Sequence, residues 1–309
     1  MPKQAASAKS TKVSRLEEAI REQRDKLGQL RPNSCYPLLL SNTSIDGHVV
    51  DDVYDDLRRN YGVGCDRLDV IVDSGGGDVD AAYNLAQLFR RYGRQRLVFI
   101  VPRWAKSAAT LLVCGGDSVL MTPVAELGPV DPQITEMNPL ERRLEQFSPL
   151  HIESTLELIR DEYKAGNKQL ADGLMQRLQF PLTLGSYKKS MELGKQYLIK
   201  LLSTRMLGGK THQEVEAVAK RLTEGYADHG FCINLQEAQA IGLEAQELST
   251  EELDIVWEIH RLTRQKSEVE RERRRREIEK RIKEIPPELI EKLPSDLFRR
   301  PEKQDTASS

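Results

Sequence analysis

The sequence predicts an α/β protein with a parallel sheet, and three consecutive segments support this class. Residues 68–72 and 97–101 are compact apolar runs rich in β-branched side chains, as in buried strands. Residues 81–92 between them have the apolar spacing of an amphipathic helix. A strand, a helix and a strand in so short a stretch form a βαβ unit, so the strands are parallel and the crossover is right-handed.

The segments before this unit are predicted from the same patterns. The small polar residues 1–13 are expected to be disordered, and residues 14–30 have the sparse apolar positions of an exposed helix. A short apolar strand over residues 36–40 and a helix over residues 49–60 follow.

The segments directly after the unit are short and apolar. A helix that contains residues 111–114 ends at two glycines, and residues 118–121 form one more strand. Residues 125–132 contain two prolines and a glycine, which predicts a stiff turn.

The second half of the chain is predicted to be mostly helical. Residues 151–222 have helical spacing, with breaks near Gly166, Phe180-Pro181 and Gly208-Gly209. A capping box at Thr211 and a similar cap at Asn234 mark two helix starts, and a charge-rich helix follows Thr250. Four prolines from Pro286 onward predict an extended or loosely docked tail. We therefore divide the chain into an N-terminal extension (1–31), a core domain (32–250) and a charged helical C-terminal tail (251–309).

Composition excludes several classes of protein. The net charge of the 309 residues is only -2, so no global field favours nucleic acid as a partner. The four cysteines form no CxxC pair, which argues against a zinc site and a disulfide framework and favours a reducing, cytoplasmic setting. No apolar run has the length of a signal peptide or a membrane span, so a soluble, unexported protein is expected.

A glycine cluster follows the first strand of the unit. Three glycines, Gly75 to Gly77, bring bare backbone N–H groups to the end of that strand, where they can bind an anion or a developing oxyanion. Three chemistries use such donors: phosphate binding, stabilisation of a thioester enolate, and acyl transfer to a serine. The phosphate-loop pattern is absent, because no Gly-Lys-Ser/Thr follows at the required spacing.

Ser107 follows the second strand and favours acyl transfer. It lies among small residues, Ala105, Ala108 and Ala109, at the start of an apolar helix whose dipole favours negative charge on an attacked oxygen. The alternative is that Ser107 only caps this helix, as serines often do.

Three motifs together resemble a known family. They are Asp-Ser-Gly-Gly-Gly at 73–77, Ala-Lys-Ser-Ala-Ala-Thr at 105–110 and Glu-Leu-Gly-Pro-Val-Asp-Pro-Gln at 126–133. In order and spacing they resemble the serine dehydrogenase proteinases, relatives of the Clp protease proteolytic subunit and of signal peptide peptidase A. The resemblance covers roughly residues 35–245 and implies a ClpP/crotonase-like fold of repeated ββα units with a helical C-terminal extension. It also implies that Ser107 is the nucleophile, that the N–H groups of Gly77 and Ala108 form the oxyanion hole, and that Gly76 shapes the turn.

The general base is left open among three residues. Where the Clp subunit has its histidine, this chain has Asp131 and no histidine, so a Clp-type triad is in doubt. Resemblance to signal peptide peptidase A implies a Ser/Lys dyad instead, with the lysine well beyond the serine in the chain. Lys164 and Lys168 lie in or near the segment where that lysine is expected. His229 is the third candidate, because it lies in the segment where the Clp subunit has its triad acid and because an imidazole in general needs little tuning to act as a base near pH 7. Lys106 is a weaker site candidate that should point away from the nucleophile.

The resemblance implies a serine endopeptidase that needs no metal or organic cofactor. Its substrates would be peptides or unfolded proteins, with a membrane-protein substrate left open, and it would form a homo-oligomer through residues 151–222. One alternative is a crotonase-like enzyme acting on an acyl thioester, which would place acidic residues around the site. The other is an inactive scaffold that binds a partner or nucleic acid through the arginine-rich residues 271–276.

Overall fold

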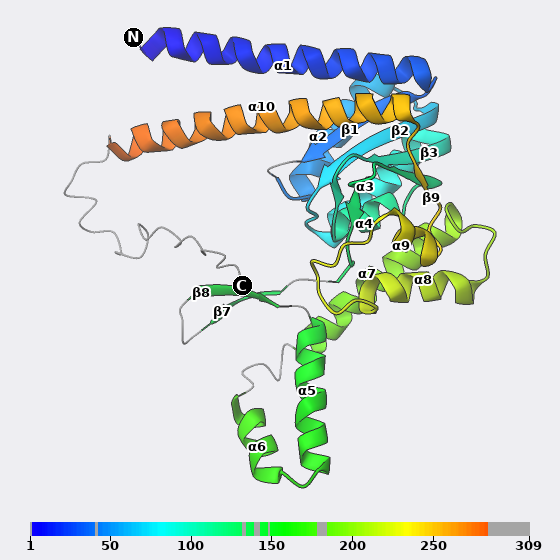
Figure 1. Ribbon diagram of the computed structural model, residues 1–309, viewed down its shortest axis with the longest axis vertical. Coiled ribbons are helices and arrows are strands. Elements are labelled where there is room, and N and C mark those ends of the chain that lie inside the picture. Colours follow the sequence, from blue (N-terminus) through cyan, green and yellow to red (C-terminus); the bar gives the residue numbers. More distant parts are fainter. Residues whose placement is uncertain are drawn as a thin grey trace.

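A parallel β-sheet forms the centre of the protein (Figure 1). The computed structural model describes residues 2–40, 43–131, 134–138, 143–147, 149–177 and 184–283. Six strands pair in the order β6-β4-β2-β3-β5-β9. A seventh strand, β1, lies off this path and also pairs with β2. The strands are β1 (Ser34–Leu40), β2 (Cys65–Ser74), β3 (Gly93–Val101), β4 (Trp104–Ala105), β5 (Ser118–Met121), β6 (Glu126–Leu127) and β9 (Ala245–Glu247).

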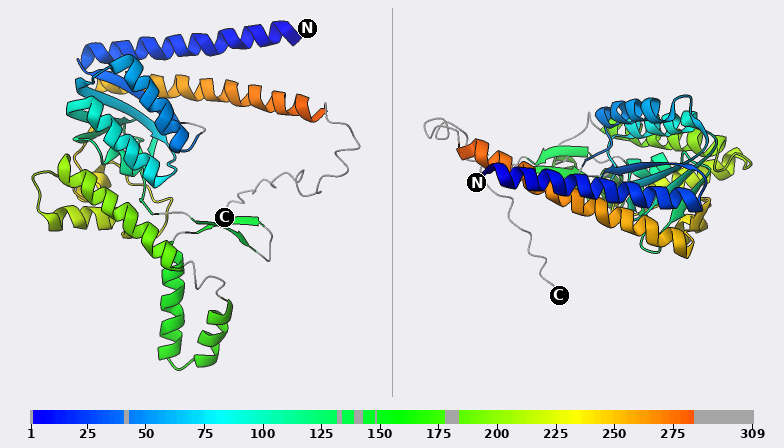
Figure 2. Two further views of the ribbon diagram at one scale, coloured as in Figure 1. Left: turned by 180° about the vertical axis from the view of Figure 1, so that it is seen from behind. Right: turned by 90° about the horizontal axis from the view of Figure 1, so that it is seen from above.

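Helices surround this sheet and extend beyond it, and two further strands form a separate hairpin. The helices are α1 (Pro2–Leu30), α2 (Gly47–Tyr61), α3 (Val79–Tyr92), α4 (Ala108–Val113), α5 (Pro149–Lys164), α6 (Lys168–Arg177), α7 (Leu184–Thr204), α8 (His212–Glu224), α9 (Leu235–Ala240) and α10 (Thr250–Lys283). The hairpin consists of β7 (Ile134–Asn138) and β8 (Arg143–Phe147). Helices α5 and α6 project away from the sheet, on the side opposite α1 and α10 (Figures 1 and 2).

Alternating side chains of β2 create two separate apolar cores. Val70 packs on one face of the sheet in the larger cluster, together with Phe89 of α3. Ile71 points to the other face, where it joins Val256 of α10 and Leu27 of α1. Because successive side chains of a strand alternate between faces, the predicted apolar run serves both cores. Helices α1 and α10 thus cover one face of the sheet.

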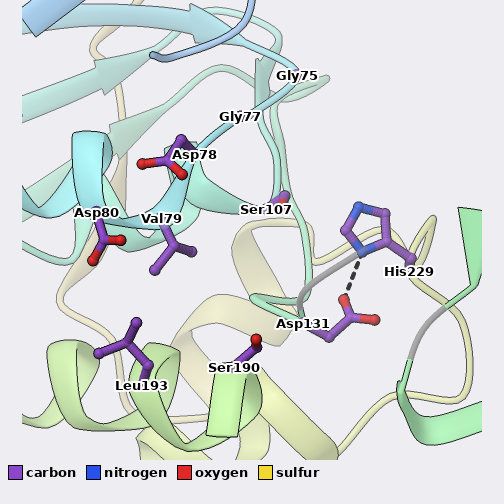
Figure 3. A pocket seen from close by; sticks show the side chains of 10 residues that line it. All are labelled: Gly75, Gly77, Asp78, Val79, Asp80, Ser107, Asp131, Ser190, Leu193 and His229. Carbon is purple, nitrogen blue, oxygen red and sulfur yellow. Dashed lines mark hydrogen bonds and ion pairs between the residues drawn. The ribbon is translucent and has the colours of Figure 1, made fainter. Parts of the chain in front are cut away.

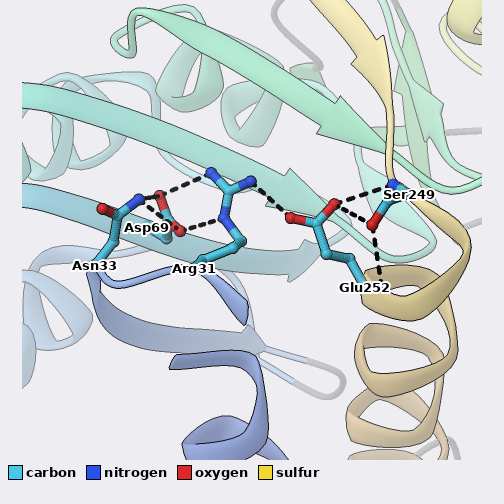
Figure 4. A network of polar contacts seen from close by, with 5 residues as sticks. All are labelled: Arg31, Asn33, Asp69, Ser249 and Glu252. Atoms are coloured by element: carbon cyan, nitrogen blue, oxygen red, sulfur yellow. Dashed lines mark hydrogen bonds and ion pairs between the residues drawn. The ribbon is translucent and has the colours of Figure 1, made fainter. Parts of the chain in front are cut away.

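The face under α1 and α10 also contains a buried ion-pair network (Figure 4). Arg31 donates to Asp69 of β2 at 2.6 Å and to Glu252 of α10 at 2.9 Å, and Asn33 donates to the same aspartate. Burial alone would lower the pKa of the Arg31 guanidinium, but its hydrogen bonds to Asp69 and Glu252 outweigh burial and raise the pKa. Ser249 completes the network by donating to Glu252 at 2.8 Å. The network fixes the end of α1 and the start of α10 to the same strand.

Most predicted elements are confirmed, and the differences have local causes. The βαβ unit, the strand at Ser118–Met121 and the caps at Thr211 and Asn234 lie where the sequence placed them. The expectation of disorder over residues 1–13 was wrong, because α1 begins at Pro2 in an alanine-rich segment with high helix propensity. The stiff turn contains the short strand β6, and β9 was not predicted. The break at Phe180-Pro181 and the tail from Pro286 lie outside the described residues.

Candidate active site

A cavity of about 510 Å³ lies where the two predicted turns meet (Figure 3). Ser107 borders it from the start of α4, and Gly77 borders it from the turn after β2. Asp131 and His229 form the opposite side, and α7 closes the cavity from below in this view. The complete lining is Gly75, Gly77, Asp78, Val79, Asp80, Ser107, Asp131, Ser190, Leu193 and His229.

The backbone at Ser107 is strained. Its φ of 52° and ψ of -121° make it the only non-glycine residue with a positive φ among those described. Strain of this kind is found where a nucleophile is held on a sharp turn between a strand and a helix. Ser107 precedes α4, but its side chain makes no capping hydrogen bond, so the interpretation of Ser107 as only a helix cap was wrong.

Gly76 allows the two turns to touch. A Cβ at this position would lie 2.7 Å from the carbonyl oxygen of Lys106 and 2.9 Å from the Cβ of Ser107. The φ of Gly76 is +108°, a conformation that side chains with a Cβ rarely adopt. A glycine is therefore required for the nucleophile turn to lie directly against the turn after β2.

Two backbone N–H groups at this junction are available to an oxyanion. Within the described part of the chain, no backbone hydrogen bond uses the N–H of Gly77 or that of Ala108. Gly77 is held in place by its neighbours, since Ile45 donates to the carbonyl of Gly76 at 2.9 Å and accepts from Asp78 at 2.7 Å. Fixed donors of this type can stabilise negative charge without reorganising during the reaction.

His229 forms a short hydrogen bond with Asp131 on one side of the cavity. The Nδ1 atom of His229 lies 2.6 Å from Oδ1 of Asp131, whose side chain is only 2% exposed. In Figure 3 the second ring nitrogen of His229 points away from this carboxylate, and Ser107 lies on the opposite side of the cavity. A buried carboxylate on Nδ1 fixes the tautomer in which Nε2 is free to accept a proton.

Both segments of this pair are held together by backbone contacts. Leu127 and Ile233 form an antiparallel bridge through hydrogen bonds of 2.9 and 3.1 Å. Val130 donates to the carbonyl of Leu222 at 2.8 Å, which anchors the chain just before Asp131. The bridge lies a few residues from Asp131 on one segment and from His229 on the other.

Residues 57–274 match the family described as ClpP-like SDH-type serine proteinases. This match covers well over half of the chain and includes every residue of the cavity. The chain belongs to this family. As family members share a fold, the match agrees with the parallel sheet and with the ClpP/crotonase-like fold expected from the sequence.

Two relatives of this chain are uncharacterized proteins from one organism. The uncharacterized protein MJ0137 of Methanocaldococcus jannaschii is 28% identical over 204 residues, or 66% of this chain and 62% of the relative. The uncharacterized protein MJ1495 of the same organism is 23% identical over 177 residues, or 57% of this chain and 51% of the relative. The chain thus spans between half and two thirds of the length of these relatives.

The solved structures that align with this chain include two proteases. A serine-to-alanine mutant of the 1510-N membrane-bound stomatin-specific protease aligns with a TM-score of 0.42 and 14% identity, over 72% of this chain and 83% of that one. ClpP1 from Listeria monocytogenes aligns with a TM-score of 0.39 and 12% identity, over 76% of this chain and 95% of that one. Among the described residues of this family member, no helix is long and apolar enough to span a bilayer.

The structure places the two candidate lysines of this ClpP-like proteinase away from the cavity. Lys164 lies at the end of α5 with its side chain 68% exposed, and its ammonium group is 3.9 Å from Asp161. Lys168 is exposed at the start of α6, where its ammonium lies over the ring of Tyr163. Neither lysine lines the cavity, and both helices project from the body (Figure 1).

Lys106 points away from Ser107, as expected. Its ammonium group pairs with Glu126 at 2.9 Å and donates to the carbonyl of Phe231 at 3.2 Å. Burial alone would raise the pKa of Glu126, but hydrogen bonds from Lys106 and Arg103 hold that pKa below its ordinary value. Lys106 thereby ties the nucleophile turn to β6 and to the loop of His229.

The partner of His229 was missed by sequence reasoning. The sequence analysis gives His229 as one of three candidate bases and Asp131 only as the residue at the position of the Clp histidine, and it does not pair the two. An aspartate and a histidine in these two segments, each where the other type is expected, are the signal that could have paired them. The residue types of a triad are set by geometry and not by chain order.

Proposed function

We propose that this chain is a serine endopeptidase with Ser107 as nucleophile and His229 as general base. Ser107 Oγ attacks a peptide carbonyl while Nε2 of His229 takes the hydroxyl proton, and Asp131 stabilises the imidazolium that forms. The N–H groups of Gly77 and Ala108 hold the oxyanion. His229 then gives the proton to the leaving amine, and the acyl-enzyme remains. In the second half of the reaction His229 takes a proton from water, which attacks the acyl carbonyl, and returns it to Ser107 as the carboxylic acid product leaves.

One observation carries the proposal. A serine on a strained turn shares a single cavity with Gly77 and with a histidine that is hydrogen-bonded to a buried aspartate, and the N–H groups of Gly77 and of the adjacent Ala108 lack backbone partners in the described chain. A general base must reach the nucleophile, although hydrogen bonds in an unliganded site are often longer than in the complex. His229 is favoured as the base because it borders the same cavity as Ser107, whereas Lys164 and Lys168 do not border it.

The acyl-thioester alternative has one supporting observation. Asp78 and Asp80 line the same cavity, as that reading requires. Both carboxylates already have partners, because Asp78 caps α3 through Ala81 at 2.7 Å and Asp80 accepts from Tyr197 at 2.7 Å. This arrangement favours the peptidase, in which Ser107 has a role.

A fluorophosphonate probe separates the two functions, since it forms a covalent bond only with an activated serine. We expect the wild-type protein to be labelled and Ser107→Ala to be unlabelled. Asp66→Asn is a matched control, because Asp66 is exposed and pairs with Arg94 far from the cavity. A wild-type protein that is folded and yet unlabelled would refute the peptidase, and turnover of an acyl thioester would then support the alternative.

We also propose that the substrate is a peptide or an unfolded protein and that the chain forms a homo-oligomer. Large apolar side chains stand 52–55% exposed on α5 and α6, namely Leu158, Tyr163, Leu170 and Met175. Such side chains in one helical projection are typical of contact surfaces. Hydrolysis of casein tests the substrate class. Light scattering of the wild type and of Leu158→Glu tests the assembly, because a charge in an apolar contact should dissociate it.

A further inference from the structure

We propose that His260 of α10 is a positioning residue for this active site and that it acts through Asp73 of β2. The inference rests on the proposed function and adds a group that does not border the cavity. It makes α10 a part of the catalytic scaffold. The scaffold alternative instead gives the same helix only a partner-binding role, through residues 271–276.

His260 and Asp73 form a buried pair. Nδ1 of His260 lies 2.6 Å from Oδ2 of Asp73, and both side chains are only 3% exposed. The other carboxylate oxygen of Asp73 accepts the backbone N–H of Trp104 at 3.3 Å. One buried carboxylate therefore connects a helix to the first residue of β4.

The two ends of this connection lead directly into the two turns of the site. Asp73 precedes Ser74, after which the chain enters the glycines of the oxyanion hole. Trp104 is the first of the two residues of β4, and Lys106 and Ser107 directly follow this strand. Ser74 pairs with Ala105 in the sheet, and its carbonyl accepts from the N–H of Lys106 at 3.1 Å. This short ladder and the carboxylate of Asp73 both join the two turns at this level, so the carboxylate contributes to their alignment.

Aromatic rings fix the orientation of the imidazole. Trp257 stacks on the ring of His260 at 5.0 Å, and Trp104 meets it edge-on at 6.4 Å. Trp257 belongs to α10, whereas Trp104 belongs to the nucleophile strand. The ring is therefore held between the helix and the strand that it aligns, and its Nδ1 can point only toward Asp73.

The helix that carries His260 is itself firmly attached to the sheet. Val256 and Ile259 are fully buried against the strands, and Glu252 is tied to β2 through Arg31. Beyond this region α10 continues alongside α1, where Lys266 pairs with Glu17 at 2.7 Å (Figure 2). A displacement of α10 would be transmitted through His260 to both turns. Removal of all residues after Thr250 would accordingly remove a part of the site.

The test uses two substitutions of the same histidine in the full-length chain. Asparagine places its amide nitrogen close to the position of Nδ1 and can still donate to Asp73, whereas glutamine is one methylene longer and cannot donate from that position. We expect His260→Gln to lower the fluorophosphonate labelling rate and kcat between about ten- and a hundredfold with little change in KM, because misaligned turns slow the chemistry. His260→Asn should stay within about threefold of wild type. His212→Gln, at an exposed position of α8, is the matched control.

Hydrogen exchange provides a second readout that does not depend on activity. In His260→Gln we expect residues 101–107 and 73–78 to lose protection while α2 keeps it. Equal labelling of His260→Gln and wild type, with unchanged exchange in these two segments, would overturn the inference even if the melting temperature falls. If the wild type itself is not labelled, the proposed function fails. The exchange measurement then decides alone whether His260 aligns the two turns.

Discussion

Replacing Asp131 by asparagine tests the catalytic pair with almost no change in shape. The carboxylate lies 2.6 Å from Nδ1 of His229 and is buried, so it stabilises the imidazolium that forms as Ser107 is deprotonated. With charge centres about 4 Å apart and an effective dielectric constant of about 20, this attraction is about 4 kcal/mol, or about a thousandfold in rate. The His229 side chain is 30% exposed, and solvent screening reduces the expected loss to about a hundred- to a thousandfold.

The assay is the rate of fluorophosphonate labelling, followed by kcat on a peptide substrate once one is known. Asp131→Asn should lose activity mainly in kcat, because the substrate does not need the charge in order to bind. Asp66→Asn, which removes an exposed carboxylate, should label at the wild-type rate. If Asp131→Asn labels within about threefold of wild type while Ser107→Ala is unlabelled, Asp131 does not support the base.

Three further predictions concern the turn, the base and the ion-pair network. Gly76→Ala should lower the free energy of unfolding by at least about 2 kcal/mol, measured by urea titration, because its Cβ would lie 2.7 Å from a carbonyl oxygen at a φ of +108°. Lys164→Ala and Lys168→Ala should each keep the wild-type labelling rate, and a loss of about tenfold or more in either would restore a lysine base. Burial would raise the pKa of Glu252, but hydrogen bonds from Arg31 and Ser249 outweigh it and lower the pKa below 4.5. The stabilisation is therefore complete above that pH and is lost as pH falls through the folded-state pKa, and the difference in stability between wild type and Glu252→Gln should shrink in acid unfolding curves.

The parts of the fold that the sequence predicts are those with local causes. The βαβ unit can be predicted from residue spacing within single segments. The glycines come directly after β2, and Ser107 comes just after β4. Strands β6 and β9 have only two and three residues, and neither has a periodicity that could reveal it. Their pairing with β4 and β5 is decided by tertiary contacts.

The candidate site divides along the same line. The sequence predicts Ser107 as the nucleophile and Gly77 and Ala108 as the N–H donors because two adjacent turns contain them. The pair of Asp131 and His229 joins positions 98 residues apart, and that of Asp73 and His260 joins positions 187 residues apart. A pattern within one segment of the sequence cannot predict contacts between residues so far apart in the chain. Asp73 and Asp131 were also hard to recognise as buried partners of histidines, because aspartate side chains are mostly exposed in proteins.

The contact between the segments of Asp131 and His229 explains why the acid and the base can exchange places. The bridge between Leu127 and Ile233 holds the two segments side by side, so both reach the same side of the cavity. A triad requires an imidazole near the serine and a carboxylate behind it, and chain order does not enter this requirement. Here the carboxylate lies on the more buried segment, 2% exposed, and the imidazole on the more open one, 30% exposed. This order shields the carboxylate from water and leaves the imidazole facing the cavity. The missing histidine after the nucleophile is therefore no argument against a Ser-His-Asp site in this chain.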